Sequence, residues 1–155
     1  MIRSKPRTVA PDMPEQRHPV PDARASSSST DHRAHSPALR ITVERPEVGL
    51  PVVRMTGEID LSCTGRLEEL IRQRMTAASL RAIVLDLTGI TFCGSCGVEM
   101  LLQAQCRANQ RDVELHVVPG TGPVQRMLEL TGTRPFFELH TTTARALAAA
   151  RGQPR

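Results

Sequence analysis

Aromatic side chains are scarce in this chain of 155 residues, which has no Trp, no Tyr and three Phe, at positions 92, 136 and 137. Proteins that bind single-stranded nucleic acids stack the bases on aromatic side chains. The net charge is +4, and the basic residues do not form the stripe that accompanies binding to a phosphate backbone. We therefore expect no nucleic-acid partner.

Long apolar runs are also missing. No stretch approaches the roughly 20 apolar residues of a membrane-spanning helix, so no membrane partner is expected. The N-terminal sequence MIRSKPRTVAPDM is basic but lacks the apolar segment of a signal peptide. Without a sign of secretion, the four cysteines predict reduced thiols rather than a disulfide framework. The sequence therefore predicts a cytoplasmic protein.

The composition changes near residue 38. Residues 1–38 are rich in Pro, Ser, Arg and His, and such a segment buries too little apolar surface to offset the entropy lost on ordering. We predict a disordered N-terminal tail over 1–38, a folded domain over 39–150 and a disordered C-terminus over 151–155.

Within the folded domain, apolar periodicity predicts strands that alternate with helices. Strands are predicted over 39–44, 52–59, 82–87 and 113–117, with an edge strand within 135–139. Helices are predicted from an N-cap at Ser62, from about Ser95, over 124–131 and over 141–150. The first two strands form a hairpin, whereas strand–helix–strand succession implies parallel strands and right-handed crossovers. The predicted class is α/β, with a mixed sheet of four to five strands, parallel in its centre, and about four helices.

The stretch TFCGSCG, residues 91–97, leaves the predicted central strand 82–87 and enters a helix. Ligands and partners gather at such loops in open α/β sheets. A serine there is accessible, and a phosphate on Ser95 would face the unpaired N–H groups and the positive end of the helix. Ser95 is also a reasonable helix N-cap. The residues alone leave both roles open, and the two are compatible.

Four motifs in order resemble the STAS domain, and in particular the anti-sigma factor antagonists, which control bacterial transcription by partner switching. They are GEID at 57–60, IVLDLTGITF at 83–92, Ser-x-Gly at 95–97 and PVQRMLELTG at 123–132. The resemblance covers nearly the whole predicted domain. It implies a non-enzymatic phosphoprotein that binds an anti-sigma factor of the serine protein kinase type and releases a sigma factor. A PP2C-type phosphatase would reset the switch.

In the family that this chain resembles, the loop after the central strand reads Asp-Ser-Ser/Thr-Gly, and the partner kinase phosphorylates its first serine. By position that serine is Ser95, whereas Gly94 replaces the Asp and Cys96 the second hydroxyl residue. The lost carboxylate removes an acceptor beside the target hydroxyl, although Glu99 is expected to supply an acid in the first helical turn. The partner-binding residues implied by the resemblance are Asp60, Gly94, Ser95, Cys96, Gly97 and Glu99.

Two alternatives remain open. Thioredoxin-like proteins carry a Cys-x-x-Cys between a strand and a helix, where the helix N-terminus lowers a thiol pKa; Cys93 and Cys96 therefore make a thiol redox sensor or oxidoreductase the main rival. The predicted hairpin at the start of the domain argues against it, as does Phe92, which is expected to be buried in its strand. The second alternative is a degenerate STAS scaffold that binds its partner without phosphorylation.

Catalysis is not expected, because Asp86 and the other acids near strands have no His or second acid at a useful spacing. No cofactor is expected either. Metal binding is not expected because Cys63 and Cys106 fall in predicted helices without the paired spacing of ligands. His116 and His140 are interpreted as a strand-face residue and a loop residue.

Overall fold

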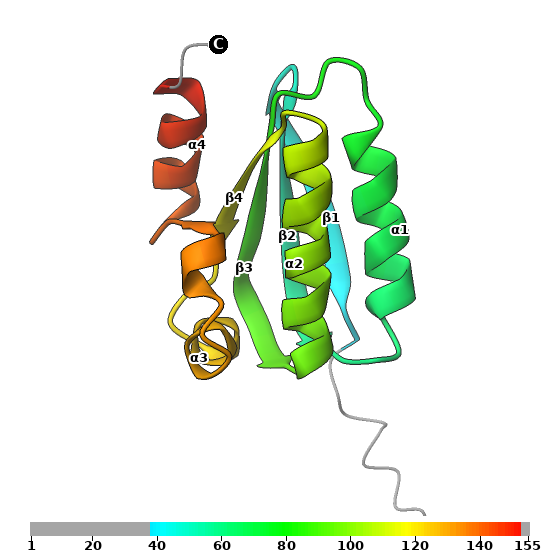
Figure 1. Ribbon diagram of the computed structural model, residues 1–155, viewed down its shortest axis with the longest axis vertical. Coiled ribbons are helices and arrows are strands. Elements are labelled where there is room, and N and C mark those ends of the chain that lie inside the picture. Colours follow the sequence, from blue (N-terminus) through cyan, green and yellow to red (C-terminus); the bar gives the residue numbers. More distant parts are fainter. Residues whose placement is uncertain (1–37, 153–155) are drawn as a thin grey trace, which may run out of the picture. The chain divides into compact units, whose positions relative to one another are not determined.

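The computed structural model describes residues 38–152, which contain five strands and four α-helices (Figure 1). The strands are β1 (Arg40–Glu47), β2 (Leu50–Ile59), β3 (Ala82–Cys93), β4 (Glu114–Val118) and β5 (Glu138–Leu139). The helices are α1 (Thr64–Met75), α2 (Ser95–Gln110), α3 (Pro123–Leu130) and α4 (Thr143–Gly152). Residues 1–37 and 153–155, which belong to the two predicted tails, lie outside the described residues.

The sheet has the strand order β1-β2-β3-β4-β5, in which β1 and β2 are antiparallel and the other pairs are parallel. Each new parallel strand is added on the same side, so right-handed crossovers place α1, α2 and α3 on one face. Helix α4 follows β5 and packs on the opposite face (Figure 1). The predicted α/β class, with a parallel centre and an antiparallel edge, is confirmed.

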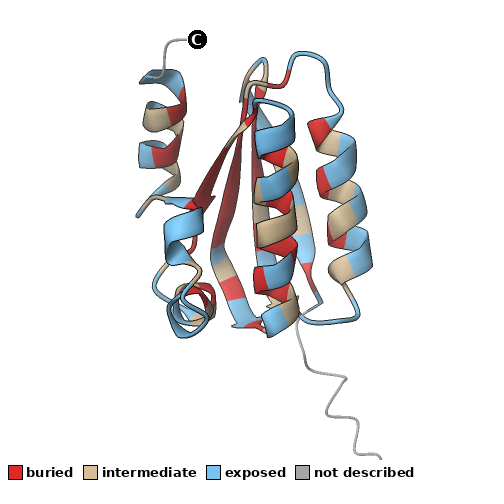
Figure 2. Cartoon of the chain, viewed as in Figure 1, coloured by how far each residue is buried: buried red, intermediate tan, exposed pale blue. Residues whose placement is uncertain are grey.

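Two apolar cores lie on the two faces of the sheet, and Figure 2 shows the buried residues on the strands and on the inward sides of the helices. The larger core joins the sheet to α1, α2 and α3, and the smaller one joins it to α4. All six residues from Ala82 to Leu87 are buried. The prediction of a central strand covered on both faces is therefore confirmed.

Several element boundaries differ from the predictions. Helix α1 begins at Thr64 with Cys63 in the N-cap position, so Ser62 is not its cap. In the segment predicted as an edge strand, residues 134–136 form a 3₁₀ turn and the strand itself is two residues long. Helix α4 continues to Gly152, so residues 151 and 152, predicted to be disordered, are helical.

Gly57, the first residue of the GEID motif, has a φ of 107°. Residues with a Cβ rarely adopt this conformation. The pairing of β2 with β3 shifts register between Gly57 and Glu58, and a bulge of this kind bends its strand and changes the strand's direction. Gly57 therefore sets the direction of the end of β2 and of the loop that follows it.

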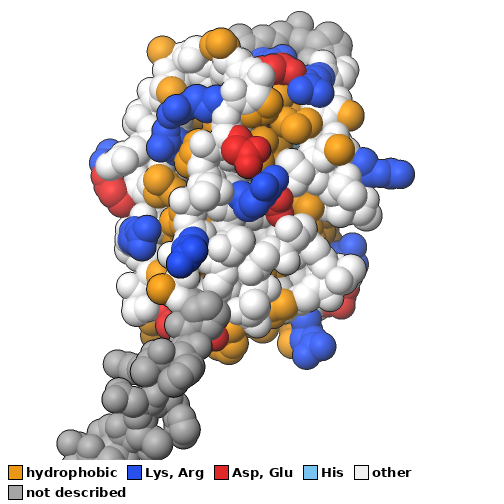
Figure 3. Space-filling model, turned by 180° about the vertical axis from the view of Figure 1, so that it is seen from behind, with side chains coloured by type: hydrophobic (Ala, Val, Ile, Leu, Met, Phe, Trp, Pro, Cys, Tyr) orange, Lys and Arg blue, Asp and Glu red, His pale blue; other side chains and the backbone are white. Residues whose placement is uncertain are grey.

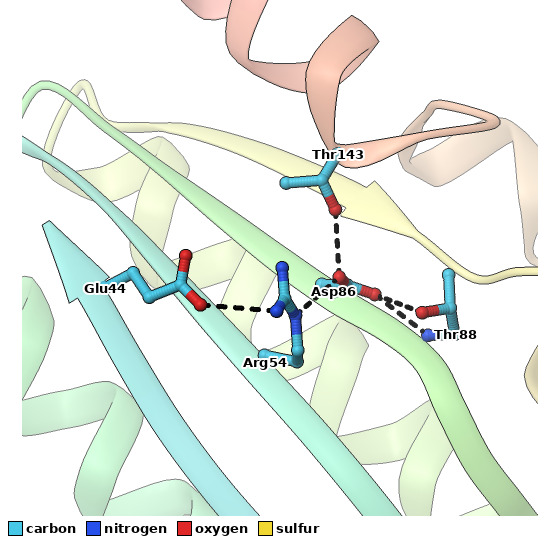
Figure 4. Close-up of polar contacts among 5 residues, drawn as sticks. All are labelled: Glu44, Arg54, Asp86, Thr88 and Thr143. Carbon is cyan, nitrogen blue, oxygen red and sulfur yellow. Dashed lines mark hydrogen bonds and ion pairs between the residues drawn. The ribbon is translucent and has the colours of Figure 1, made fainter. Parts of the chain in front are cut away.

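On the face opposite α1 and α2, acidic and basic side chains lie close to one another over the strands (Figure 3). Asp86 of β3, which is 4% exposed, is the centre of a network on this face (Figure 4). It accepts hydrogen bonds from Arg54 Nε at 3.0 Å, from Thr143 Oγ1 at 2.9 Å and from Thr88 N and Oγ1 at 3.0 and 2.7 Å. Asp86 is therefore a structural carboxylate that links β2 and the start of α4 to the central strand β3.

Candidate partner-binding site

The candidate site lies where the parallel strands β2 and β3 end. Ile59 and Cys93 are paired across these strands, and the Gly94 N–H donates to the Ile59 carbonyl at 3.0 Å. The loop that starts at Asp60 and the loop that carries Ser95 therefore leave the same edge of the sheet. The structure thus brings together the two segments that the sequence analysis assigned to partner binding.

Ser95 is the first residue of α2 and is exposed to solvent. The N-cap position belongs to Gly94, so the interpretation of Ser95 as an N-cap is wrong. Its hydroxyl makes no hydrogen bond to any residue that the structure describes. The first N–H groups of a helix lack intrahelical acceptors and carry partial positive charge. The Ser95 hydroxyl is therefore accessible at an end that favours added negative charge.

Gly97 is buried where α2 meets the sheet. A Cβ at this position would lie 2.6 Å from Cys93 Sγ and 3.2 Å from Ile59 Cγ2. Real Cβ atoms do not approach a sulfur so closely, so this position requires glycine. Because Gly97 has no side chain, the first turn of α2 packs directly on the ends of β2 and β3. This packing fixes the position of Ser95.

Asp60 is exposed in a tight turn before α1. Its Oδ1 accepts hydrogen bonds from the Ser62 N–H at 2.9 Å and from the Ser62 hydroxyl. Its carbonyl accepts the Cys63 N–H at 3.3 Å and the Cys63 thiol at 3.2 Å. Ser62 and Cys63 therefore hold the turn, and the Asp60 side chain has a fixed position at the edge of the site.

Glu99 is exposed, but it lies beyond the first turn of α2, which contains no acid. The prediction of a first-turn acid is therefore wrong. Residues four apart share one side of a helix, so Glu99 lies on the same side as Ser95. A phosphate on Ser95 would add to the negative charge of this side.

Two large apolar side chains of the site are exposed, Leu61 at 82% and Phe92 at 50%. The prediction that Phe92 is buried is wrong. Its neighbour Cys93 faces the core under α2, so Phe92 lies on the other face of β3, where α4 packs against Ala82 and Val84 at the opposite end of the strand. Phe92 Cε1 would lie 3.9 Å from a Cβ on Gly94. Leu61 and Phe92 lie at the ends of β2 and β3, the same edge of the sheet as Ser95. Neither residue was predicted to belong to this surface, and only their position at the ends of their strands could have indicated it.

No disulfide joins the cysteines of the site. All four cysteines of the chain are free thiols. Cys93 is buried, and burial raises the pKa of its thiol to about 11, with a further contribution from nearby Cys96 and Cys63. Redox-active cysteines have lowered pKa values because the thiolate is the reacting species. With its raised pKa, Cys93 is a poor candidate for the attacking thiol of a redox dithiol.

We expect Gly94→Asp to stabilise the fold modestly, by a few tenths up to about 1 kcal/mol. The Gly94 backbone has φ −79° and ψ 174°, an extended conformation open to any residue. A Cβ there would make an ordinary contact with Cys96 Sγ at 3.4 Å. Aspartate could then accept a hydrogen bond from the first turn of α2. Thermal unfolding measures the effect, and Gly94→Ala, which adds the Cβ without the acceptor, is the control that should not stabilise.

A family model for the STAS domain matches residues 40–146. This chain belongs to the STAS domain family. It is 34% identical over 104 residues to the anti-sigma-F factor antagonist RsfB of Mycobacterium tuberculosis. The alignment covers 67% of this chain and 84% of RsfB. The crystal structure of an anti-sigma factor antagonist from Mycobacterium paratuberculosis has 30% identity and a TM-score of 0.62, covering 74% of this chain and 95% of that one.

The phosphorylated form of the Bacillus cell fate determinant SpoIIAA has the same fold, with a TM-score of 0.55 and 16% identity, over 72% of this chain and 100% of that one. The predicted STAS fold is thus confirmed. None of the helices in residues 38–152 has the length and hydropathy of a membrane span.

Proposed function

We propose that this STAS domain is an anti-sigma factor antagonist that binds an anti-sigma factor of the serine protein kinase type, releases a sigma factor and is controlled by phosphorylation of Ser95. The observation that carries the proposal is the exposed, unengaged Ser95 hydroxyl at the start of α2. The relatives' names as anti-sigma factor antagonists support the choice of partner. Residues 39–150 would carry the binding, without the predicted tails.

The partner surface would consist of the exposed loop ends around Ser95, with Leu61 and Phe92 as apolar contacts. The polar and small residues of this surface are Asp60, Gly94, Ser95, Cys96, Gly97 and Glu99. Gly97 contributes indirectly, because it is buried and lets the first turn of α2 approach the sheet closely. Unmodified, this edge combines apolar and acidic groups and can be covered by a partner.

Phosphorylation would leave the domain folded but weaken the complex. A phosphate adds about 1.5 to 2 negative charges at pH 7, and the N-terminus of α2 favours such a charge. A docked partner would have to bury it beside Glu99. Weakening the complex ten- to hundredfold requires about 1.4–2.8 kcal/mol, which one desolvated charge can supply. SpoIIAA, solved in phosphorylated form, is a precedent for a domain of this fold that carries phosphate.

The partner kinase would have to accept a loop without the acidic residue at Gly94. A PP2C-type phosphatase would remove the phosphate and restore binding. If no kinase modifies Ser95, the domain is instead a scaffold that binds its partner constitutively, as the missing carboxylate would allow. The redox alternative is not favoured because the pKa of Cys93 is raised to about 11 by burial.

The test measures binding of the cognate anti-sigma factor to the wild type and to Ser95→Ala and Ser95→Asp. We expect Ser95→Ala to bind like the wild type and Ser95→Asp to bind about ten- to hundredfold more weakly. Incubation with the kinase and ATP should place one phosphate on Ser95, as mapped by mass spectrometry, and none on Ser95→Ala.

The matched control is Ser79→Asp, which adds the same charge at an exposed position at the other end of the sheet and should leave binding unchanged. Labelling of Ser95→Ala at the wild-type level would refute the switch. Tight binding without any labelling would favour the constitutive scaffold. A loss of binding on mild oxidation that Cys96→Ser prevents would favour the redox alternative.

A further inference from the structure

The tripeptide Glu-Leu-His occurs twice, at residues 114–116 in β4 and at 138–140 at β5. The two strands are parallel neighbours, and the Cα atoms of His116 and Glu138 are paired. Side chains two residues apart in a strand lie on the same face. The register therefore places two glutamates and two histidines together on the face of the sheet that α4 covers, away from the Ser95 edge.

Three of these side chains form a compact triangle of ligand atoms. His116 Nδ1 lies 3.0 Å from His140 Nε2 and 3.5 Å from Glu138 Oε1, and the third side, from His140 Nε2 to Glu138 Oε1, is 3.6 Å. A tetrahedral Zn²⁺ with bonds of about 2.0–2.2 Å holds its ligand atoms roughly 3.3–3.6 Å apart. Three donors thus already stand near the separations of a zinc site, on a rigid pair of strands.

The fourth member of the cluster, Glu114, orients the buried histidine. Its Oε2 lies 3.0 Å from His116 Nε2, which suits the tautomer that has its proton on Nε2. The Nδ1 lone pair then accepts the His140 Nε2–H at 3.0 Å in the metal-free protein, and an ion would take the place of that proton. Ligating histidines commonly donate their other ring N–H to a carboxylate in this way, which fixes the tautomer and raises the basicity of the ligand. Among the described residues, His116, Glu138 and His140 are the group whose ligand atoms approach closely enough to share an ion.

We propose that His116 Nδ1, Glu138 Oε1 and His140 Nε2 bind one Zn²⁺ ion, with Glu114 as the carboxylate that orients His116. Two imidazoles and one carboxylate suit zinc, and three protein ligands leave a position for water. His140 would bind as the neutral ring with its proton on Nδ1. The His116 side chain is 0% exposed, His140 13% and Glu138 45%, so an ion enters from the solvent side past Glu138.

The ion would stabilise the weakest edge of the sheet. Strand β5 is two residues long and leads through His140 to α4. An ion bound to His116 of β4 and to Glu138 and His140 would tie β4 to this short segment. It would thus stabilise the place where the chain crosses to the face of the sheet that α4 covers. The site is separate from the Ser95 edge and does not depend on the proposed partner.

The experiment uses the full chain, stripped with a chelator and kept reduced, and titrates it with Zn²⁺ by calorimetry. We expect one saturable site in the wild type and a rise of the melting temperature with Zn²⁺. Glu138→Gln and His140→Gln change partly exposed side chains, should fold without metal, and should lose both responses. Glu114→Gln should bind about 10- to 100-fold more weakly, as expected of an orienting residue.

Two controls test whether cysteines or histidines outside this cluster bind the ion. Cys63→Ser and Cys106→Ser should bind Zn²⁺ like the wild type, and so should a variant with Ala at His18, His32 and His35. The proposal is overturned if the wild type shows no saturable binding, if Glu138→Gln and His140→Gln bind like the wild type, or if binding disappears in either control.

Discussion

Replacing Asp86 by Asn is expected to lower the free energy of unfolding by about 2–4 kcal/mol, because it removes one partner of a buried charged network. Asp86 Oδ1 accepts both bonds from Thr88, and Oδ2 accepts those from Arg54 and Thr143. Asparagine keeps one acceptor and puts an NH₂ group in the place of the other. If the amide oxygen stays with Thr88, the NH₂ group faces the Arg54 Nε–H, and two donors meet without an acceptor.

The same substitution weakens the attachment of α4. Thr143 is the first residue of that helix, and its hydroxyl reaches the Asp86 carboxylate at 2.9 Å (Figure 4). A negative charge at a helix N-terminus is favourable, and the amide of Asn does not supply it. We expect hydrogen exchange in α4 to accelerate more than in α2. Urea unfolding at pH 7 measures the global loss.

The effect of Asp86→Asn should depend on pH in a defined direction. Burial alone would raise the pKa of Asp86, but hydrogen bonds from Thr88, Thr143 and Arg54 outweigh burial and place the pKa below its ordinary value. A carboxyl with a lowered folded-state pKa stabilises fully above its unfolded pKa of about 3.9 and loses that contribution as the pH falls through the folded pKa. The stability difference between the wild type and the variant should thus stay constant above about pH 5 and shrink below about pH 4.

Glu44→Gln is the matched control for the network. Glu44 pairs with Arg54 at 3.2 Å, but their side chains are 56% and 42% exposed, and exposed ion pairs contribute about 0–1 kcal/mol. We expect this variant to lose less than about 1 kcal/mol at pH 7. If Asp86→Asn lost no more than Glu44→Gln, the buried network would not be the anchor that the contacts suggest.

The arrangement of the sheet could be predicted because its signals are local and strong. The run from Ala82 to Leu87 is almost entirely apolar, as expected of a strand covered on both faces. The alternation of strands with helices then restricts the topology through the handedness of crossovers. The short β5 was harder, because two strand residues leave no period to detect and the preceding Pro135 belongs to a 3₁₀ turn.

Within the candidate site, the loop was predictable and its details were not. The strand-to-helix junction at residues 93–95 follows from the change of period, but a shift of one residue decides whether Ser95 or Gly94 is the N-cap. Phe92 is exposed because it lies on the face of β3 opposite Cys93, away from the strand residues against which α4 packs, and this depends on where α4 lies along the sheet. Such properties arise from tertiary packing and leave no local pattern.

The Glu-Leu-His repeat is visible in the sequence, but its meaning depends on how the strands pair. Its two copies are 24 residues apart along the chain, and a shift of one residue in the register of β5 would turn its glutamate and histidine to the other face of the sheet. The observed pairing of His116 with Glu138 brings them together. The cluster could be recognised only once the register was known, and register is set by the whole sheet.

Gly97→Ala is expected to destabilise the fold by about 1–3 kcal/mol through overpacking, although alanine is the better helix former. The added Cβ would stand 2.6 Å from Cys93 Sγ, so either the start of α2 or the end of β3 must move. Because Ser95 lies two residues earlier in the same turn, we expect binding of the anti-sigma factor to weaken as well. Urea unfolding and the binding assay measure the two effects.

Gly65→Ala in α1 is the matched control, because a Cβ there meets nothing within 4 Å; it should stabilise by about 0.4–1 kcal/mol. A double-mutant cycle then tests the cause. Cys93→Ala removes the sulfur that the new Cβ meets, so Gly97→Ala with Cys93→Ala should be more stable than the sum of the single changes implies, by about 0.5–3 kcal/mol. Additive losses would mean that contact with Ile59 or with the backbone, and not with Cys93, makes a side chain at position 97 unfavourable. If that contact is with Ile59, the position of Ser95 depends on packing against β2 rather than β3.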